Sequence, residues 1–173
     1  MKRVHIIGGK NHGKTTLVVD LVGEFRTRGM RVGTIKHTHH SHELDMPGKD
    51  SHRHREAGAE VSGILSQSMN AIFWNDEGLK NSEESHSIPD GRYRSFDWAF
   101  ADCEILLVEG DTQTDALKLE VWRAINKTPP IAGVIKSVLA IVTDDPVETS
   151  LPILSRTNVA AVADFILDSC CHQ

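Results

Sequence analysis

The sequence has few cysteines and no long hydrophobic run. Its three cysteines, Cys103, Cys170 and Cys171, are odd in number, and sequence neighbours rarely pair, so we expect reduced thiols rather than a disulfide framework. No stretch approaches the roughly 20 apolar residues of a membrane span, and the apolar run at the N-terminus is shorter than the ~7 to 15 residue core of a signal peptide. We therefore expect a cytoplasmic protein that does not enter a membrane.

A surplus of positive charge is also missing. Lys+Arg number 19 against 24 Asp+Glu, which gives a formal net charge of -5. This acidic balance does not favour nucleic-acid binding, and the sequence has no stripe of aromatic and basic residues that would bind a single strand. The 39% hydrophobic and 25% charged residues are typical of a globular protein, and 173 residues suit a single domain over residues 1–173.

The first 35 residues predict a parallel strand–helix–strand unit. Residues 4–7 are mostly β-branched and end at two glycines, which is typical of a buried strand. After Lys14, apolar residues recur at helical spacing until Gly29, which is expected to end the helix. Residues 30–35 then predict a second strand. The predicted helix stripe consists of Leu17, Val18, Leu21, Val22 and Phe25.

The rest of the chain predicts further strands at 105–108, 117–122 and 138–142, and a last helix capped by Asn158. Residues 37–50 form a long polar loop, and loops of this length are more often functional than not.

Between the loop and these later strands, Asp50 and Ser51 are predicted to cap a short helix through Ala57. Residues 61–65 and 71–74 predict an antiparallel hairpin added to the sheet. Residues 76–92 are polar and predicted to be flexible.

Residues 8–15 match the phosphate-loop pattern G-x-x-x-x-G-K-[ST] between a predicted strand and a predicted helix. Such a loop curls its backbone N–H groups around a phosphate at the positive end of the helix. Lys14 is expected to reach the β- and γ-phosphates, Thr15 to bind Mg²⁺ and Thr16 to reach the α-phosphate. The predicted nucleotide-binding residues of the loop are Gly8, Gly9, Lys10, Asn11, His12, Gly13, Lys14, Thr15 and Thr16.

A phosphate loop also needs an acid at the end of another strand, and Glu109 follows the apolar run 105–108. We predict that Glu109 holds Mg²⁺ or its water shell, and that Lys14 and Glu109 are the catalytic residues. Asp45 and Asp50, on the polar loop, are secondary candidates. The predicted metal ligands are therefore Thr15, Glu109 and Asp45.

Several segments together resemble a known family, the MobB GTP-binding protein of molybdopterin guanine dinucleotide biosynthesis. The resemblance covers most of residues 2–145, and its first half is the more specific. Its segments are Ile35-Lys36-His37-Thr38-His39-His40, Asp45, Pro47-Gly48-Lys49-Asp50-Ser51, Arg55-Glu56-Ala57-Gly58-Ala59, Leu107-Val108-Glu109-Gly110, and Lys118, Glu120 and Arg123.

The resemblance implies an α/β fold, a P-loop NTPase three-layer sandwich with a mostly parallel sheet and an added antiparallel hairpin. It implies GTP and Mg²⁺ as cofactors, a homodimer, and weak GTPase activity. It also implies an adapter role toward the molybdopterin guanylyltransferase, an enzyme of the MobA type. The chain departs from the family after Gly110, where Asp111-Thr112 replaces the usual aromatic residue and lysine. Lys10 stands one place beyond the signature lysine of related deviant loops, so we assign it no role at a partner's nucleotide.

We predict that the base is guanine and that its reader lies after the strand 138–142, where Thr143-Asp144-Asp145 occupies a strand end. A carboxylate accepts from guanine N1–H and the exocyclic amine, and adenine has no matching donor pair. We predict Asp144 rather than Asp145, because Pro146 restrains the residue before it.

Two alternatives stay open at the level of sequence. A metallochaperone GTPase would use the histidine cluster His37, His39, His40, His42, His52 and His54, although no cysteine lies near this loop. A small-molecule kinase would need an arginine-rich lid, for which Arg53, Arg55, Arg92 and Arg94 are available.

Overall fold

The computed structural model describes residues 2–38, 43–74 and 91–170. The chain divides into two compact units, Met1–Thr38 with Tyr93–Gln173, and His39–Arg92. Each unit is described by itself. A single domain over residues 1–173 stays a prediction.

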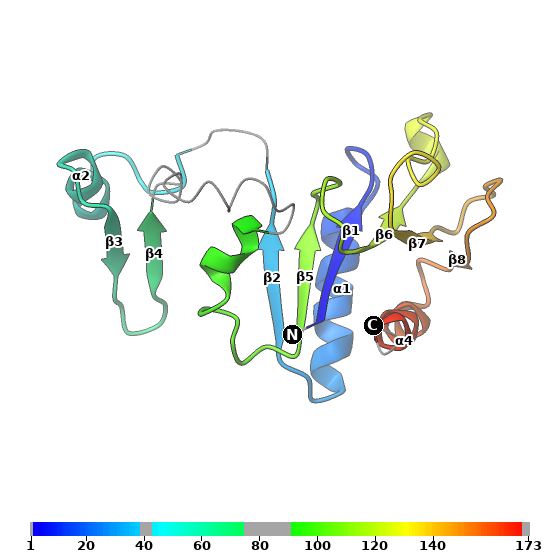
Figure 1. Cartoon of the computed structure of the whole chain (residues 1–173), viewed down its shortest axis with the longest axis horizontal. Coiled ribbons are helices and arrows are strands. Elements are labelled where there is room, and N and C mark those ends of the chain that lie inside the picture. The colour runs from blue at the N-terminus through cyan, green and yellow to red at the C-terminus, as the bar shows by residue number, and fades with distance from the viewer. Residues whose placement is uncertain (1, 39–42, 75–90, 171–173) are drawn as a thin grey trace. The chain divides into compact units, whose positions relative to one another are not determined.

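The first unit is built on a six-stranded sheet with the strand order β2-β5-β1-β6-β7-β8 (Figure 1). All five strand pairs are parallel, so the carboxyl ends of the strands lie along one edge of the sheet. The two-residue strand β8 was not predicted, since so short a run carries no periodicity. The strands are β1 (Lys2–Ile7), β2 (Val32–Lys36), β5 (Ile105–Glu109), β6 (Leu117–Val121), β7 (Val138–Val142) and β8 (Ile153–Leu154).

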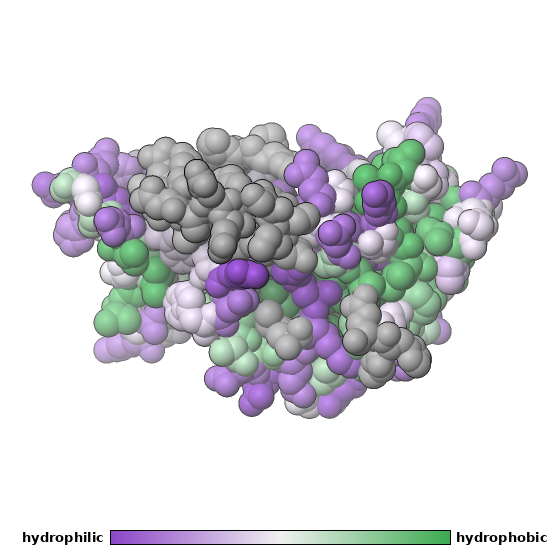
Figure 2. Space-filling model, viewed as in Figure 1, coloured by the Kyte–Doolittle hydropathy of each residue, from purple (hydrophilic) through white to green (hydrophobic). Residues whose placement is uncertain are grey.

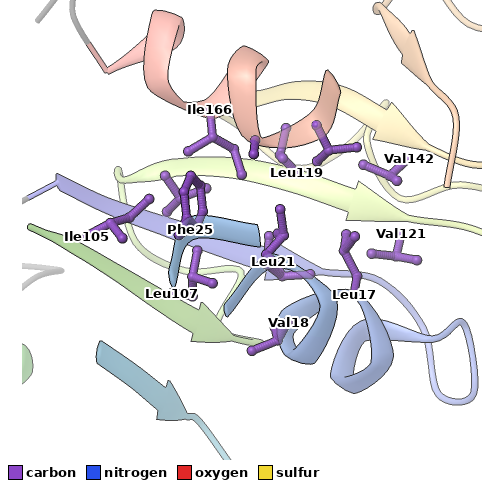
Figure 3. Close-up of a cluster of buried hydrophobic side chains, with 14 of the residues drawn as sticks. Leu17, Val18, Leu21, Phe25, Ile105, Leu107, Leu119, Val121, Val142 and Ile166 are labelled. Carbon is purple, nitrogen blue, oxygen red and sulfur yellow. The ribbon is translucent and has the colours of Figure 1, made fainter. Parts of the chain in front are cut away.

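Two helices, α1 (Lys14–Thr27) and α4 (Val159–Ser169), cover one face of this sheet (Figure 3). The predicted stripe of α1 is confirmed: Leu17, Leu21 and Phe25 are fully buried against the strands. Asn158 caps α4 as predicted, because its Oδ1 accepts from the Ala161 N–H at 3.1 Å. This apolar layer holds α1, and therefore the loop that precedes it, against the centre of the sheet.

The other face of the sheet has a thinner cover. Strand β5 alternates, so that Ile105 and Leu107 face the helices while Leu106 and Val108 face the opposite side. There they pack with Tyr93, which belongs to the 3-10 segment η2 (Gly91–Phe96). A further 3-10 turn, η3 (Ala124–Asn126), follows β6. Neither 3-10 segment was predicted.

The parallel six-stranded sheet and the helices packed on it confirm the predicted α/β sandwich with a mostly parallel sheet.

The second unit contains α2 (Asp50–Glu56) and a hairpin of β3 (Val61–Ile64) and β4 (Ala71–Trp74). The antiparallel hairpin is confirmed, but the prediction that it joins the main sheet is wrong. Within the described part of the chain, β3 and β4 form a separate two-stranded sheet. The hairpin is stabilised by its own neighbours in the chain. Strand β3 packs against α2, and among the described residues β3 and β4 hydrogen-bond only with each other.

The predicted helix through Ala57 is confirmed, but its predicted cap is wrong. Lys49 occupies the N-cap position and makes no side-chain capping bond. Ser51 lies inside the helix, where its hydroxyl donates to Asp45 Oδ1 at 2.9 Å. The segment predicted to be flexible falls largely at residues 75–90, outside the described residues. No helix among the described residues is long and apolar enough to cross a membrane.

Candidate functional site

The phosphate loop connects β1 to α1 at the carboxyl edge of the sheet, as the sequence predicts. Gly8 has φ 139°, and a Cβ placed there would lie 2.3 Å from the Val121 carbonyl oxygen of β6. The first residue of the loop therefore has to be glycine. Gly13 occupies the N-cap position of α1, so the helix begins at Lys14.

Lys14 points its ammonium group back into the loop. Its Nζ donates to the Gly8 carbonyl at 3.0 Å and to the Gly9 carbonyl at 2.8 Å. Burial lowers the pKa of Lys14, and Lys36 lowers it further, while Glu109 opposes both effects. The loop thus holds a partly buried cation where the pattern predicts a phosphate-binding lysine.

Thr15 and Glu109 meet across the edge of the sheet. The Thr15 hydroxyl donates to Glu109 Oε1 at 2.7 Å, joining the first turn of α1 to the end of β5. The structure therefore brings together two of the three predicted metal ligands. A hydroxyl and a carboxylate are oxygen donors of the kind that Mg²⁺ takes in phosphate-loop sites, so these residues fit that ion.

Asp45, the third predicted ligand, belongs to the second unit, where it is buried. Its Oδ1 accepts from the Met46 N–H at 2.8 Å, and its Oδ2 lies 3.5 Å from Arg55 Nε. Together with the hydrogen bond from the Ser51 hydroxyl, these contacts hold the segment that leads into α2. A role for Asp45 at a metal stays a prediction.

His12 belongs to the phosphate loop, but its side chain is buried. Its Nδ1 accepts from the Arg123 N–H at 2.9 Å, so the proton of the neutral ring is on Nε2, which lies 3.0 Å from Thr128 Oγ1. Burial, then Lys14 and Arg123, lower the pKa of His12 and keep this form. Next to it, Asn126 donates to the Asn11 carbonyl at 3.2 Å. The segment after β6 thus anchors the loop.

The predicted base reader lies at the end of β7. Asp144 Oδ1 accepts from the Ser155 hydroxyl at 2.6 Å and from the Arg156 N–H at 2.9 Å. These bonds, that of Ser155 foremost, lower the pKa of Asp144, so it is ionised at neutral pH. Asp145 instead accepts from the Ala124 N–H through Oδ2 at 2.8 Å. The two neighbouring acids therefore differ in their contacts.

Sequence reasoning missed the part that Arg156 plays at this edge. Its backbone bonds Asp144, its Nη1 pairs with Asp20 of α1 at 3.2 Å, and its Nε lies 3.9 Å from the position of a Cβ on Gly13. Arg156 thus joins the end of β7 to the start of α1. No local pattern marks this arginine, because it follows a strand too short to predict.

Glu120, named in the sequence analysis only as part of the family resemblance, is buried at the end of β6. Its carboxylate accepts from the Ile131 and Ala132 N–H groups at 2.9 and 2.7 Å, and burial raises its pKa. These bonds hold the connection between η3 and β7. The alternation of charged residues with apolar ones in β6 could have indicated a buried, paired acid.

The predicted histidine cluster is only partly described, since His39, His40 and His42 lie outside the described residues. His52 faces Glu43 and Glu56 at 3.6 and 3.4 Å. In the portion of the chain that the structure covers, no three His, Cys, Asp or Glu side chains gather in a way that would hold a metal ion.

Similarity to known proteins agrees with this geometry. The family model for molybdopterin guanine dinucleotide synthesis protein B matches residues 3–144. A molybdopterin-guanine dinucleotide biosynthesis adapter protein of Haemophilus influenzae is 34% identical over 163 residues, covering 93% of this chain and 85% of the relative. The Escherichia coli adapter protein is 29% identical over 157 residues, covering 90% and 86%.

Solved structures have the same fold. The crystal structure of a molybdopterin-guanine biosynthesis protein B superposes with a TM-score of 0.69 at 24% identity, covering 96% of this chain and 98% of that one. MobB of Bacillus subtilis superposes with a TM-score of 0.66 at 21% identity, covering 98% of each chain. With its phosphate loop, its acid at the end of β5 and a family match over most of its length, this chain belongs to the molybdopterin guanine dinucleotide synthesis protein B family.

Proposed function

We propose that the chain is a GTP-binding adapter that assists the attachment of GMP to molybdopterin, the step that forms molybdopterin guanine dinucleotide. The observation that carries this proposal is the contact between Thr15 and Glu109 beside Lys14, because it assembles the phosphate and metal side of a nucleotide site. The relatives in Haemophilus influenzae and Escherichia coli bear the name of adapter proteins of this pathway, which supports the accessory role.

Residues of the loop and α1 would hold the nucleotide. Lys14 would exchange the Gly8 and Gly9 carbonyls for phosphate oxygens, which are stronger partners for an ammonium group. The N–H groups of residues 8–16 would bind the remaining phosphate oxygens at the start of the helix.

Mg²⁺, when bound, would neutralise charge on the β- and γ-phosphates. Thr15 would contribute its hydroxyl to the ion. Glu109 would accept hydrogen bonds from the water shell of the ion, and so orient it. Asp45 remains a secondary candidate for the same role.

Guanine would be read by Asp144. The Ser155 and Arg156 bonds both go to Oδ1, and they hold the carboxylate in one orientation as an anion. An ionised carboxylate accepts from two donors of guanine, whereas adenine offers it an unprotonated ring nitrogen. GTP is therefore expected to bind more tightly than ATP.

A homodimer is part of this proposal. Apolar side chains are exposed on the β3–β4 hairpin and its turn, where Figure 2 shows them in green. Exposed apolar patches of this kind are typical of interaction surfaces. Sedimentation at twice the 19.1 kDa mass of one chain would support the dimer, and sedimentation at one mass would contradict it. The exposed side chains include Val61, Ile64, Leu65, Met69 and Ile72.

The main partner would be the MobA-type molybdopterin guanylyltransferase, and a cytoplasmic location stays a prediction from the sequence. Competition binding of GTP against ATP with Mg²⁺ tests the nucleotide claim, and equal affinities would contradict it. Adding the chain to a reaction of guanylyltransferase, molybdopterin and GTP tests the adapter claim. The yield of dinucleotide should rise with the wild-type chain and not with Lys14→Ala. Transfer of phosphate from ATP to a metabolite would instead favour the kinase alternative.

A further inference from the structure

Asp111, two residues after Glu109, is a buried and fully bonded carboxylate. It is 3% exposed, its Oδ2 accepts from the Tyr93 hydroxyl at 2.5 Å, and its Oδ1 accepts from the Gln113 N–H at 3.1 Å. An acid in an ordinary surface turn would be solvated instead. Asp111 is therefore part of the internal structure that follows the end of β5.

The backbone of the same turn is held by His5 of β1. His5 is fully buried, and its Nδ1 lies 3.2 Å from both the Gly110 and the Asp111 carbonyl oxygens. Since carbonyls only accept, Nδ1 carries the proton and donates to them. The His5 ring also meets the Tyr93 ring edge to face at 5.5 Å. His5, Tyr93 and Asp111 thus form one buried cluster.

Asp111 adopts a backbone conformation that is uncommon for non-glycine residues, although less so for aspartate and asparagine than for the others. Its φ is 60°, in the left-handed region. Such a residue persists only where its surroundings hold it. The bonds from Tyr93, Gln113 and His5 to Asp111 supply that restraint, so removing one of them is expected to let the turn relax.

The same turn carries Glu109 at its other end. The Glu109 carbonyl accepts from the His37 N–H at 2.9 Å, and its carboxylate accepts from Thr15. The chain leaves this unit after Thr38 and returns at Tyr93. Glu109 is thus bonded to His37, next to the point where the chain leaves this unit. Asp111 is bonded to Tyr93, where the chain returns.

We propose that Asp111, anchored by Tyr93 and His5, is the positioning residue that directs the Glu109 carboxylate toward Thr15 and Mg²⁺. This inference rests on the proposed function in that it takes Glu109 to be the acid of the metal site. In this proposal Asp111 and Tyr93 act on the metal site through Glu109 and not by binding the nucleotide themselves.

The test compares Tyr93→Phe and Asp111→Ala with wild type in GTP binding, at increasing Mg²⁺ and in EDTA. Loss of an outer-shell partner typically costs 10- to 100-fold in metal affinity. Asp111 and Tyr93 act one step further out, through Glu109, so the Mg²⁺ concentration for half-maximal effect should rise by about tenfold at most, and measurably above that of the wild type. Binding in EDTA should change less than twofold. Asp111→Asn keeps an acceptor oxygen and should restore much of the wild-type response. Asp115→Ala removes an exposed acid of the same loop and should have no effect.

Equal losses with and without Mg²⁺ would show a merely structural role and overturn the inference, as would an unchanged Mg²⁺ requirement. A crystal structure of Tyr93→Phe tests the inference without nucleotide. The Glu109 carboxylate should leave Thr15 Oγ1, and a contact that stays at 2.7 Å would overturn the inference. If the wild-type chain binds no guanine nucleotide, the proposed function fails, and this crystal structure still decides the positioning role.

Discussion

Lys14 and Lys10 show how two lysines of one loop differ in environment. Lys14 donates to two loop carbonyls, whereas Lys10 is exposed. Lys14→Ala should weaken GTP binding by about 1.5 to 3 kcal/mol, or roughly ten- to a hundredfold, because a charge-assisted contact is lost while the backbone cradle remains. Calorimetry measures the effect, with Lys10→Ala as the control, because it removes an exposed side chain of the same loop and keeps the backbone N–H that would face the phosphates. Wild-type affinity in Lys14→Ala would remove this lysine from the phosphate site.

Asp144 and Asp145 form a second matched pair. Asp144→Ala should abolish the preference for GTP over ATP, because it removes the acceptor for guanine N1–H and the exocyclic amine. Asp145→Ala loses the acceptor of the Ala124 N–H, so it should lower the melting temperature and keep the preference. Competition binding separates the two effects. If Asp144→Ala still prefers GTP, another group reads the base.

His5 links stability to pH. Burial lowers its pKa from 6.5 to about 4, an effect that Arg3 reinforces and that the bonds to the Gly110 and Asp111 carbonyls and the Asp111 charge oppose. The unfolded chain therefore binds a proton at a higher pH than the folded chain. The neutral form of His5 contributes its full stabilisation above the unfolded pKa of 6.5. Titration of this group lowers the free energy of unfolding by about 3 kcal/mol as the pH drops from 7 to 4.

Urea unfolding at several pH values measures this loss. His5→Asn keeps an N–H donor but has no titratable group, so its stability should fall less steeply with acid than that of the wild type. The carboxyl groups contribute equally to both proteins, and the difference between the two curves isolates His5. Parallel curves would contradict the assignment.

At the scale of elements, α1 ends in a Schellman motif. The Gly29 N–H donates to the Arg26 carbonyl at 3.0 Å and the Met30 N–H to the Phe25 carbonyl at 3.0 Å, with Gly29 at φ 79°. Gly29→Ala should lower the free energy of unfolding by about 1 kcal/mol, because an L side chain is strained at this φ.

Gly23 is the control within the same helix. It is exposed, and a Cβ built there has no atom within 4 Å. Gly23→Ala should therefore raise the free energy of unfolding by about 0.5 to 1 kcal/mol, through the higher helix propensity of alanine. Denaturant unfolding of both variants checks the opposite signs, and equal signs would contradict the motif.

At the scale of the whole molecule, we expect GTP hydrolysis by the isolated chain to be slow, around or below 1 s⁻¹. An arginine that stabilises the transition state is worth about 10³- to 10⁵-fold. Arg55 is paired with Glu43 at 2.7 Å in the second unit, and Arg156 with Asp20 in the first. We therefore expect a partner or a second copy of the chain to supply the stabilising arginine.

Single-turnover assays of the chain, alone and with the guanylyltransferase or its molybdopterin substrate, measure this rate. Hydrolysis should rise when either is added. A purified monomer that turns over many GTP molecules per second by itself would contradict the adapter role and favour an independent enzyme.

The sequence by itself determined the features that short-range patterns carry. The helical spacing of Leu17, Leu21 and Phe25 and the apolar runs of the strands predicted the parallel sheet and its helices, because burial repeats with the period of each element. The phosphate loop was also predicted from the sequence alone, because its glycines and its lysine lie close together along the chain.

Only the tertiary structure decided the contacts between residues far apart in the chain. The bonds of His12 to the segment after β6, of Arg156 to Asp144 and Asp20, and of Tyr93 to Asp111 have no local signature. The separate β3–β4 sheet also escaped prediction, because an apolar run shows that a strand forms but not which strand it joins. Partner choice depends on packing across the whole chain, and burial patterns along one segment do not encode it.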